Sequence, residues 1–242
     1  MPHLSQQCIN HLMKAILIFI FMLGFFYSLD VFADKRPLPN SRLNKLSGEK
    51  DQAYDVKSQW DQKYNKRNYV YGKRPVKFLA ENYDYLKEES EVLDMGMGEG
   101  RNAVFLASKG HIVTGIDLSS VAIKKARKLA LERNVKIKTI VGSLNKYKLP
   151  ENSFDAIVCF YFVDRDLTEK MLKWLKPGGI LIYEAYTTEQ LKKMKNKANE
   201  NEFHYLKPQE LLTMFPNTKI LKYEEPEHET EFRSSIILKK VN

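Results

Sequence analysis

The sequence has few cysteines and few residues that interrupt regular structure. Its 242 residues include two cysteines, 11 glycines and 9 prolines, and 43% of the residues are hydrophobic. This composition excludes a disordered chain and supplies enough apolar side chains for one sizeable domain. No group of cysteines or histidines has the spacing of metal ligands or of an iron–sulfur site. We therefore expect a globular domain without a metal centre.

Acidic residues are the minority among the charged ones. The sequence contains 30 aspartates and glutamates and 39 lysines and arginines, which gives a formal net charge of +9. A basic balance suits an acidic small molecule, a nucleic acid or an anionic lipid surface. A solvated basic surface without any partner explains the same charge. The charge alone therefore selects none of these classes.

Only one long hydrophobic run is present, and it lies near the N-terminus. The apolar run AILIFIFMLGFFYSL, residues 15–29, follows Lys14 and precedes Ala33. This pattern predicts a secretory signal peptide cleaved after Ala33, and hence an exported or periplasmic protein. One alternative stays open: residues 15–33 as an uncleaved membrane anchor, with the following basic residues keeping the rest of the chain in the cytoplasm.

The chain divides into three predicted segments. Residues 1–33 are the signal peptide or membrane anchor. Residues 34–50 are polar and contain two prolines, which is typical of a linker. The remaining residues, 51–242, form the domain.

Apolar strand patterns alternate with helical patterns in this domain. Strands are predicted at residues 91–94, 111–116, 135–141, 154–160 and 180–186, and helices at 102–109, 121–134 and 167–175. Strand–helix–strand units of this length imply right-handed crossovers and a parallel sheet. The last two strands, at 219–223 and 234–240, have no helix between them, so we expect an antiparallel hairpin. The sequence thus predicts a three-layer, doubly wound α/β fold, Rossmann-like and mostly parallel.

A glycine-rich turn follows the first predicted strand in the run VLDMGMGEGRN, residues 92–102. Glycine tolerates positive φ and lets backbone N–H groups approach a ligand closely. A dinucleotide-binding loop reads G-x-G-x-x-G, but Arg101 occupies the position three after Gly98. Asp94 also lies at the strand end, directly before the turn. These two differences from the dinucleotide-binding pattern disfavour NAD and favour another ligand that contains adenosine, S-adenosylmethionine (SAM).

Asp117 ends the second predicted strand, where an acid can accept hydrogen bonds from both ribose hydroxyls of a nucleotide. The same aspartate precedes Leu-Ser-Ser and has an alternative role as a helix N-cap. Its combination with the glycine loop at this spacing favours the ribose contact.

The ordered set of motifs resembles the class I SAM-dependent methyltransferases. The stretch from VLDMGMGEGRN to IDLSS is similar to their motifs I and II, and LKPGG, residues 175–179, is similar to the turn before their fifth strand. WDQKY…YVYG, GEGRNAVFLA and ILIYEAYT resemble the tellurite-resistance-type branch. The resemblance runs from about Gln59 to Lys240. It implies a seven-stranded sheet whose last strand is antiparallel, with SAM as cofactor.

The resemblance also implies roles for individual positions. Asp94, Gly96 and Gly98 would line the methionine part of SAM, Asp117 would hold its ribose, and Leu118 would pack on its adenine. Ser143 stands where these enzymes carry an acid for the adenine amino group. The complete set of expected cofactor-binding residues is Asp94, Gly96, Gly98, Arg101, Asp117, Leu118, Ser143, Leu144 and Cys159.

Absent motifs restrict the acceptor. The strand-four exit, residues 158–162, carries neither the Pro-Pro-aromatic motif of amino-methylating DNA enzymes nor the Pro-Cys of cytosine-C5 enzymes. Nucleic acid is therefore disfavoured as a partner, and Cys159 is expected to fill the core. The lysines of residues 192–197 form either a basic mouth for an anionic acceptor or a solvated helix face.

We expect the acceptor to be a small molecule. Aromatic faces favour the sulfonium charge of SAM, and Tyr69, Tyr71, Tyr161 and Tyr186 are the candidate substrate-lining residues. A thiol or metalloid anion needs little base catalysis, whereas a hydroxyl needs a base, for which His204, Glu184 and His228 are candidates. The sequence names no catalytic residue and no oligomeric state. Two alternatives stay open: a non-catalytic binding protein that keeps the fold, favoured by export away from cytoplasmic SAM, and an NAD-dependent enzyme.

Overall fold

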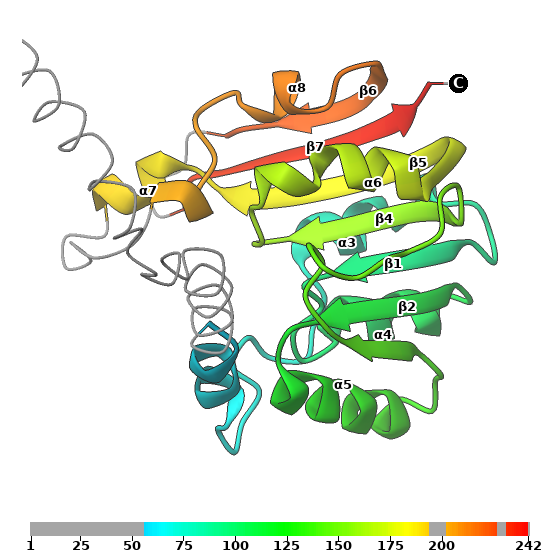
Figure 1. Ribbon diagram of the computed structural model, residues 1–242, viewed down its shortest axis with the longest axis vertical. Helices are drawn as coiled ribbons and strands as arrows, with labels where there is room; N and C mark the ends of the chain where they lie inside the picture. The colour runs from blue at the N-terminus through cyan, green and yellow to red at the C-terminus, as the bar shows by residue number, and fades with distance from the viewer. Residues whose placement is uncertain (1–55, 194–201, 227–230, 242) are drawn as a thin grey trace, which may run out of the picture. The chain divides into compact units, whose positions relative to one another are not determined.

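The computed structural model describes residues 56–193, 202–226 and 231–241. They belong to one compact unit, Gln52–Asn242. Its centre is a seven-stranded sheet with the strand order β3-β2-β1-β4-β5-β7-β6 (Figure 1). The strands are β1 (Glu91–Met95), β2 (Ile112–Asp117), β3 (Lys138–Val141), β4 (Phe154–Phe160), β5 (Leu175–Tyr186), β6 (Thr218–Glu224) and β7 (Arg233–Lys240).

The sheet is parallel except at β7. Strands β1 to β5 pair in parallel with their neighbours, whereas β7 runs antiparallel to both β5 and β6. The predicted doubly wound fold and the predicted C-terminal hairpin are therefore confirmed. The last strand does not lie at the edge, because it inserts between β5 and β6.

Helices cover both faces of the sheet. They are α3 (Lys77–Asn82), α4 (Arg101–Ser108), α5 (Ser120–Glu132), α6 (Thr168–Trp174), α7 (Thr188–Lys193) and α8 (Leu211–Met214), with short 3₁₀ turns at Tyr83–Tyr85, Arg165–Leu167 and Glu202–His204. Residues 56–64 are also helical. Figure 1 shows α6 and α8 in front of the sheet and α3 and α4 behind it. These are the three expected layers.

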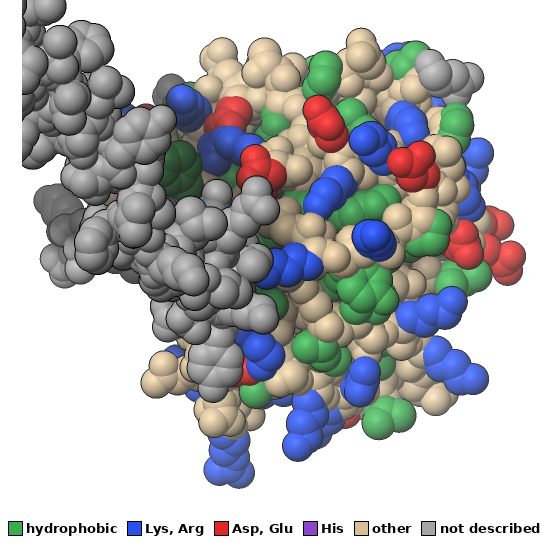
Figure 2. Space-filling model, in the orientation of Figure 1, with side chains coloured by type: hydrophobic (Ala, Val, Ile, Leu, Met, Phe, Trp, Pro, Cys, Tyr) green, Lys and Arg blue, Asp and Glu red, His purple; other side chains and the backbone are tan. Residues whose placement is uncertain are grey.

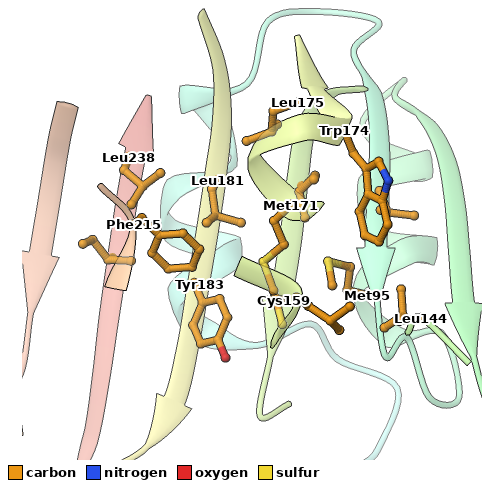
Figure 3. Packing of buried hydrophobic residues seen from close by; sticks show 14 of the residues in the cluster. Met95, Leu144, Cys159, Met171, Trp174, Leu175, Leu181, Tyr183, Phe215 and Leu238 are labelled. Atoms are coloured by element: carbon orange, nitrogen blue, oxygen red, sulfur yellow. The ribbon is translucent and has the colours of Figure 1, made fainter. Parts of the chain in front are cut away.

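Alternation along the strands builds two cores. In β4, Ile157 and Cys159 face α6 and α8, while Ala156 and Val158 face α3, α4 and α5. Figure 3 shows the first core, where Met171 and Trp174 of α6 pack over the sheet. Because parallel strands are buried on both faces, they appear in the sequence as continuous apolar runs.

The element boundaries differ from the prediction mainly at β5. The strand begins at Leu175 and runs through the Pro-Gly-Gly segment that the sequence marks as a preceding turn. Its pairing with β4 shifts register between Phe154 and Ala156. The Pro-Gly-Gly segment therefore makes an irregular strand start, since a proline has no N–H to donate and glycine permits the positive φ of Gly178.

Several predictions concern residues outside the described part. The signal peptide or anchor at residues 1–33, the linker at 34–50, the lysines beyond residue 193 and His228 all lie there. Within the described ranges, none of the helices has the length and apolar character needed to cross a membrane. The domain boundary at residue 51 remains a prediction.

Candidate functional site

The candidate site lies at the carboxyl ends of the parallel strands, beside the switch point between β1 and β4. Strand β1 leads from there through α4 to β2 on one side, while β4 and β5 lie on the other. Ligands of open α/β sheets bind at such a point because the loops diverge there. The loops that meet here follow Met95, Asp117, Val141 and Phe160.

The glycine loop joins β1 to α4 with three left-handed residues. Gly96, Gly98 and Gly100 have φ of +64°, +52° and +83°. A Cβ at Gly98 would lie 3.0 Å from the Tyr64 hydroxyl, and one at Gly100 would lie 2.6 Å from the Cβ of Ala126 on α5. The sequence prediction of a tight glycine turn is confirmed. The absence of a side chain at Gly100 allows the loop to pack closely against α5.

Asp94 is a buried carboxylate with an open acceptor. One oxygen accepts a hydrogen bond from the Ala103 backbone N–H, and Oδ2 has no partner among the described residues. Burial raises the pKa of Asp94 to about 7, and the nearby Asp117 contributes to that rise. A buried oxygen without a partner costs free energy unless a ligand satisfies it. A cationic ligand group beside the glycine loop would do so.

Asp117 fixes the glycine loop through its carboxylate. Its Oδ2 accepts from the Gly98 N–H at 2.8 Å, and its Oδ1 accepts from the Ser119 N–H at 2.8 Å. Burial raises the pKa of Asp117, while these two bonds act in the opposite direction. The N-cap of α5 is Ser119, whose hydroxyl accepts from the Ala122 N–H. The alternative role of Asp117 as the helix N-cap is therefore wrong.

A segment before α3 crosses the glycine loop, and sequence reasoning missed its contacts. Glu99 is buried and accepts from the Val70 N–H at 2.7 Å, and it pairs with Lys125 of α5 at 2.7 Å. Lys125 also donates to the Asn68 carbonyl. We call residues 60–76 the strap.

Further contacts hold the strap at both ends. Asp61 accepts from the Ser119 hydroxyl at 2.5 Å and also pairs with Lys57. Asn102 of α4 accepts from the Val76 N–H at 3.0 Å. The Trp-Asp pair of the WDQKY motif was the only sequence signal for these contacts.

Two of the four candidate tyrosines lie together. The rings of Tyr161 and Tyr186 have centroids 4.8 Å apart. The guanidinium of Arg101 lies 5.8 Å from the Tyr161 ring and 5.7 Å from the Tyr71 ring, so it connects the strap to the β4 exit. Tyr69 is separate: its hydroxyl donates to the Lys125 carbonyl, and it packs on α5.

The remaining candidates are distributed between loop and core. Leu118 and Ser143 are half-buried at the loop positions after β2 and β3. Leu144 and Cys159 are buried in the first core, and Figure 3 shows both near Met95. Cys159 is fully buried, which confirms its expected place in the core, and this burial raises the pKa of its thiol. The contact of each residue with a cofactor stays a prediction.

A polar network links the β4 exit to β5 and β7. The Tyr161 hydroxyl donates to Glu184 Oε1 at 2.8 Å, and the Ser235 hydroxyl donates to Glu184 Oε2 at 2.7 Å. Arg233 donates to the Tyr161 oxygen. Of the candidate bases, Glu184 is therefore buried in this network, whereas His204 is exposed in a 3₁₀ turn.

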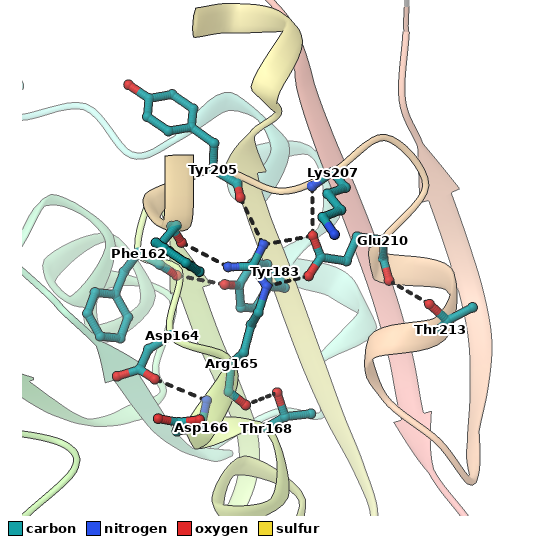
Figure 4. Close-up of polar contacts among 11 residues, drawn as sticks. Phe162, Asp164, Arg165, Asp166, Thr168, Tyr183, Tyr205, Lys207, Glu210 and Thr213 are labelled. Carbon is teal, nitrogen blue, oxygen red and sulfur yellow. Dashed lines mark hydrogen bonds and ion pairs between the residues drawn. The ribbon is translucent and has the colours of Figure 1, made fainter. Parts of the chain in front are cut away.

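A second network anchors the segment after α7. Figure 4 shows Arg165 binding both oxygens of Glu210, with Nε–Oε1 and Nη2–Oε2 distances of 2.5 and 2.8 Å. The same guanidinium donates to the carbonyls of Phe203 and Tyr205. The Glu210 carboxylate raises the pKa of Arg165. This arrangement holds the chain beside the aromatic end of β5.

Comparison with known proteins decides the class of the domain. A family model described as a methyltransferase domain matches residues 92–179, which include the glycine loop and both acids. Residues 92–179 are therefore similar to a methyltransferase domain. This match, together with the relatives described next, identifies the protein as an enzyme, a SAM-dependent methyltransferase whose cofactor is S-adenosylmethionine.

Curated relatives of the methyltransferase domain are similar over part of their length. The ubiquinone biosynthesis O-methyltransferase of Vibrio atlanticus is 24% identical over 161 residues, 57% of this chain and 68% of that protein. That of Rickettsia akari is 25% identical, covering 60% and 64%. Phosphoethanolamine N-methyltransferase 1 of Arabidopsis thaliana is 34% identical over 107 residues, 42% of this chain and 22% of that protein. The chain thus spans two thirds or less of most of these relatives.

Solved structures share the fold of the methyltransferase domain. A SAM-dependent methyltransferase from Methanosarcina mazei has a TM-score of 0.55 at 24% identity and covers 69% of this chain and 99% of its own. A structure concerned with converting a disulfide bond into a thioacetal group in echinomycin biosynthesis has a TM-score of 0.60 at 20% identity, covering 77% and 92%. The class I methyltransferase fold is therefore confirmed, and the tellurite-resistance-type branch remains a prediction.

The described residues fit this cofactor. The Asp94 oxygen without a partner lies on the β1–α4 loop, beside glycines that leave no Cβ between the backbone and a ligand. Asp117 ends the neighbouring strand. No group of three or more histidines, cysteines, aspartates or glutamates in the described ranges has the arrangement of a metal site.

Proposed function

We propose that this protein transfers the methyl group of SAM to a small-molecule acceptor bound at the carboxyl ends of β4 and β5. The observation that carries the proposal is the glycine loop with the open Asp94 oxygen, at the same sheet edge as the Tyr161–Tyr186 pair. SAM supplies an electrophilic methyl on its sulfonium. Asp94 and the glycine loop would hold its methionine part, and Asp117 its ribose.

The aromatic pair lies next to where the acceptor would bind. Arg101 contacts the Tyr161 ring from the glycine-loop side, so that ring lies between the cofactor loop and β5. Alignment of acceptor, methyl and sulfur can contribute roughly 7–11 kcal/mol to lowering the barrier. The chain's task is therefore to position the acceptor.

A small acceptor fits the available space. A pocket of about 200 Å³ lies between α3, β5, β7 and the end of β6. We keep a thiol or a metalloid anion as candidate acceptors. The relatives' names add a hydroxyl acceptor on a ubiquinone precursor and an amine, that of phosphoethanolamine.

Nucleic acid remains a disfavoured partner in this proposal. Figure 2 shows lysine and arginine side chains scattered over the face that carries α6 and α8, with acidic side chains among them. Backbone-phosphate recognition uses basic residues gathered in a patch or stripe. The proposal includes export, or membrane attachment through residues 15–33 with the domain in the cytoplasm, as the two locations to be tested.

Binding and turnover of SAM test the proposed function. Full-length protein purified in mild detergent should bind SAM and S-adenosylhomocysteine in calorimetry. It should release S-adenosylhomocysteine with at least one of catechol, a primary amine, 2-mercaptoethanol or tellurite. Folded protein that binds neither nucleoside contradicts the proposal. Binding without turnover on any acceptor would favour the non-catalytic alternative. Cell fractionation with the intact mass of the N-terminus decides between the two locations.

A further inference from the structure

We propose that the aromatic ring of Phe162 lies against the sulfonium of SAM and makes the site prefer SAM to S-adenosylhomocysteine. The two nucleosides differ by the transferred methyl group, which leaves the sulfur of SAM positively charged and that of S-adenosylhomocysteine neutral. This inference rests on the proposed function and adds the residue that recognises the charged sulfur. It requires no particular acceptor.

The side chain of Phe162 packs on the glycine loop. A Cβ at Gly96 would lie 3.3 Å from both the Cβ and the Cγ of Phe162. Gly96 is the first glycine of the loop and comes two residues after Asp94, whose Oδ2 has no partner among the described residues. Phe162 is itself only half-buried, so the protein does not enclose its ring on every side. The ring therefore lies beside the loop with surface left for a ligand.

The backbone directly before Phe162 is held in an uncommon conformation. Tyr161 has a φ of +57°, a left-handed value that few residues with a side chain adopt. Its N–H donates to the Glu184 carbonyl of β5 at 2.8 Å, and its hydroxyl donates to the Glu184 carboxylate at 2.8 Å. Such strain persists only where the surrounding contacts fix it, and it is concentrated at functional sites. Here it turns the chain so that the next side chain meets the glycine loop.

A buried tyrosine fixes the backbone of Phe162 itself. The hydroxyl of Tyr183, a fully buried residue of β5, donates to the Phe162 carbonyl at 2.7 Å (Figure 4). The Cys159 thiol donates to the same carbonyl at 3.3 Å. In Figure 4 the Phe162 ring points away from Tyr183. The carbonyl is thus held in the core while the ring stays on the glycine-loop side, so Tyr183 is a positioning residue for the ring.

The order of the strands explains why the sulfonium would lie beside this ring. In SAM the sulfur joins the methionine part to the ribose, for which Asp94 of β1 and Asp117 of β2 are the expected partners. Phe162 follows β4, which pairs with β1 on the side opposite to β2. A methyl group that reaches an acceptor at the ends of β4 and β5 must point from the glycine loop towards β4. Phe162 is the side chain of the β4 exit that packs on the loop from that side.

An aromatic ring distinguishes a charged sulfur from a neutral one. The face of a phenyl ring attracts a cation electrostatically, and this attraction is stronger at a desolvated site than at an exposed one. Apolar contact with the ring is similar for both nucleosides. When the acceptor takes the methyl group, the electron pair of the broken carbon–sulfur bond stays on sulfur, so the product offers the ring no charge. Phe162 therefore binds the cofactor more tightly before transfer than after it, which favours product release.

Calorimetry of SAM and S-adenosylhomocysteine with the full-length protein measures this preference without turnover. Phe162→Leu keeps an apolar side chain but removes the ring. It should weaken SAM binding roughly fivefold to thirtyfold, the range of a cation–π contact, and change S-adenosylhomocysteine binding by less than about twofold. Phe162→Tyr restores an aromatic ring and should keep the preference of the wild type. Asp94 and Asp117 are present in every variant, so their own attraction for SAM cancels in the comparison.

A second variant tests how the ring is positioned. Tyr183→Phe removes the hydrogen bond to the Phe162 carbonyl and should lower the preference for SAM in the same direction as Phe162→Leu, by a smaller factor. Phe105→Leu is the matched control for the ring, because it changes another half-buried phenylalanine, on α4. Tyr223→Phe is the control for the hydroxyl, since it removes a tyrosine hydroxyl from β6. Both controls should keep the preference of the wild type.

The outcomes separate charge recognition from packing. Equal weakening of SAM and S-adenosylhomocysteine by Phe162→Leu would show that the ring contributes packing alone. Unchanged binding of both would show that the ring does not contact the cofactor, and either result overturns the inference. If Phe162→Leu lacks a cooperative thermal transition, Tyr183→Phe decides, and an unchanged preference in that variant overturns the inference. Wild-type protein that binds neither nucleoside would instead overturn the proposed function.

Discussion

Single buried carboxylates define the character of this site at the residue scale. Asp94, Asp117 and Glu184 are all nearly inaccessible to water, yet two of them have every oxygen occupied by protein donors. Only Asp94 keeps an open oxygen. The domain therefore carries one acid whose charge is poorly stabilised until a ligand arrives, and such a residue is expected to favour binding at the expense of stability.

Replacing Asp94 by asparagine should reveal this cost. Its pKa is raised to about 7 in the folded protein, so the folded state holds the proton more tightly than the unfolded chain. Stability therefore falls as pH rises from about 4 to about 7 and stays low above that. A tenfold difference in proton affinity between the folded and unfolded states corresponds to about 1.4 kcal/mol. Asp94→Asn should raise the free energy of unfolding by roughly 1–3 kcal/mol at pH 8 and by little at pH 5.

Urea unfolding at the two pH values measures this, and SAM affinity should fall at least tenfold in the same variant. Asp155→Asn is the matched control, because the pKa of Asp155 is lowered and its carboxylate pairs with Lys176. It should destabilise the protein at pH 8. Equal stability of wild type and Asp94→Asn at pH 8 would contradict the role given to Asp94.

Glycines of the loop offer a second test at this scale. Gly100 and Gly110 have similar left-handed φ values of +83° and +92°. A Cβ at Gly100 would overlap Ala126, whereas one at Gly110 has nothing within 4 Å. Gly110→Ala should therefore cost about 1–2 kcal/mol, the backbone penalty alone. Gly100→Ala should cost at least 2 kcal/mol more in urea unfolding. Similar losses of unfolding free energy in the two variants would mean that α5 can shift away from the added Cβ at little cost.

At the element scale, a buried ion pair contributes to holding the strap. Glu99 and Lys125 are 3% and 16% exposed at their side chains, and Glu99 also holds the Val70 N–H. Removing one partner of a buried pair costs roughly 3–5 kcal/mol, because the other charge is left without compensation. Glu99→Ala should therefore destabilise the domain by about 3 kcal/mol and speed hydrogen exchange at Val70.

The exposed pair Lys73–Glu132 connects the strap to the same helix and serves as control. Glu132→Ala should cost less than about 1 kcal/mol, as exposed pairs do. Hydrogen exchange across the strap compares the two variants. Equal effects would show that the burial of the Glu99 pair does not matter.

The strap contacts also show what the sequence could not predict. The glycine turn, the strand runs and the hairpin depend on local patterns, so the sequence predicts the strands β1, β2 and β4 to within a residue or two. The links of Glu99 to Val70 and of Asp61 to Ser119 join positions far apart in the chain. Such contacts depend on how the completed fold brings α5 next to the strap, and no periodicity encodes them. The same holds for Glu184, which the sequence offers only as one of three candidate bases.

At the scale of the whole molecule, the late strand β7 joins two parts of the sheet. It pairs with β5 over Ile180–Tyr186 and with β6 on its other edge, so among the described strands only β7 connects β6 to the sheet. It also brings Arg233 and Ser235 to the carboxyl ends of β4 and β5, because an antiparallel strand begins where its parallel neighbours end. The last strand of the chain thus belongs both to the core and to the proposed acceptor site.

Ending the chain after Glu225 removes β7. We therefore expect this truncation to prevent folding of the whole domain, and not merely to remove one edge of the sheet. Ile236, Ile237 and Leu238 are at most 1% exposed, and burying three such side chains contributes roughly 5–9 kcal/mol. That is comparable to the entire stability of a typical domain, about 5–15 kcal/mol. Circular dichroism should show loss of the cooperative thermal transition. A chain ending after Lys240 keeps β7 intact and should unfold within about 2 °C of the full-length protein. Cooperative unfolding of the shorter chain, together with retained S-adenosylhomocysteine binding, would show that β1 to β5 are stable without the hairpin and that β7 serves only the acceptor site.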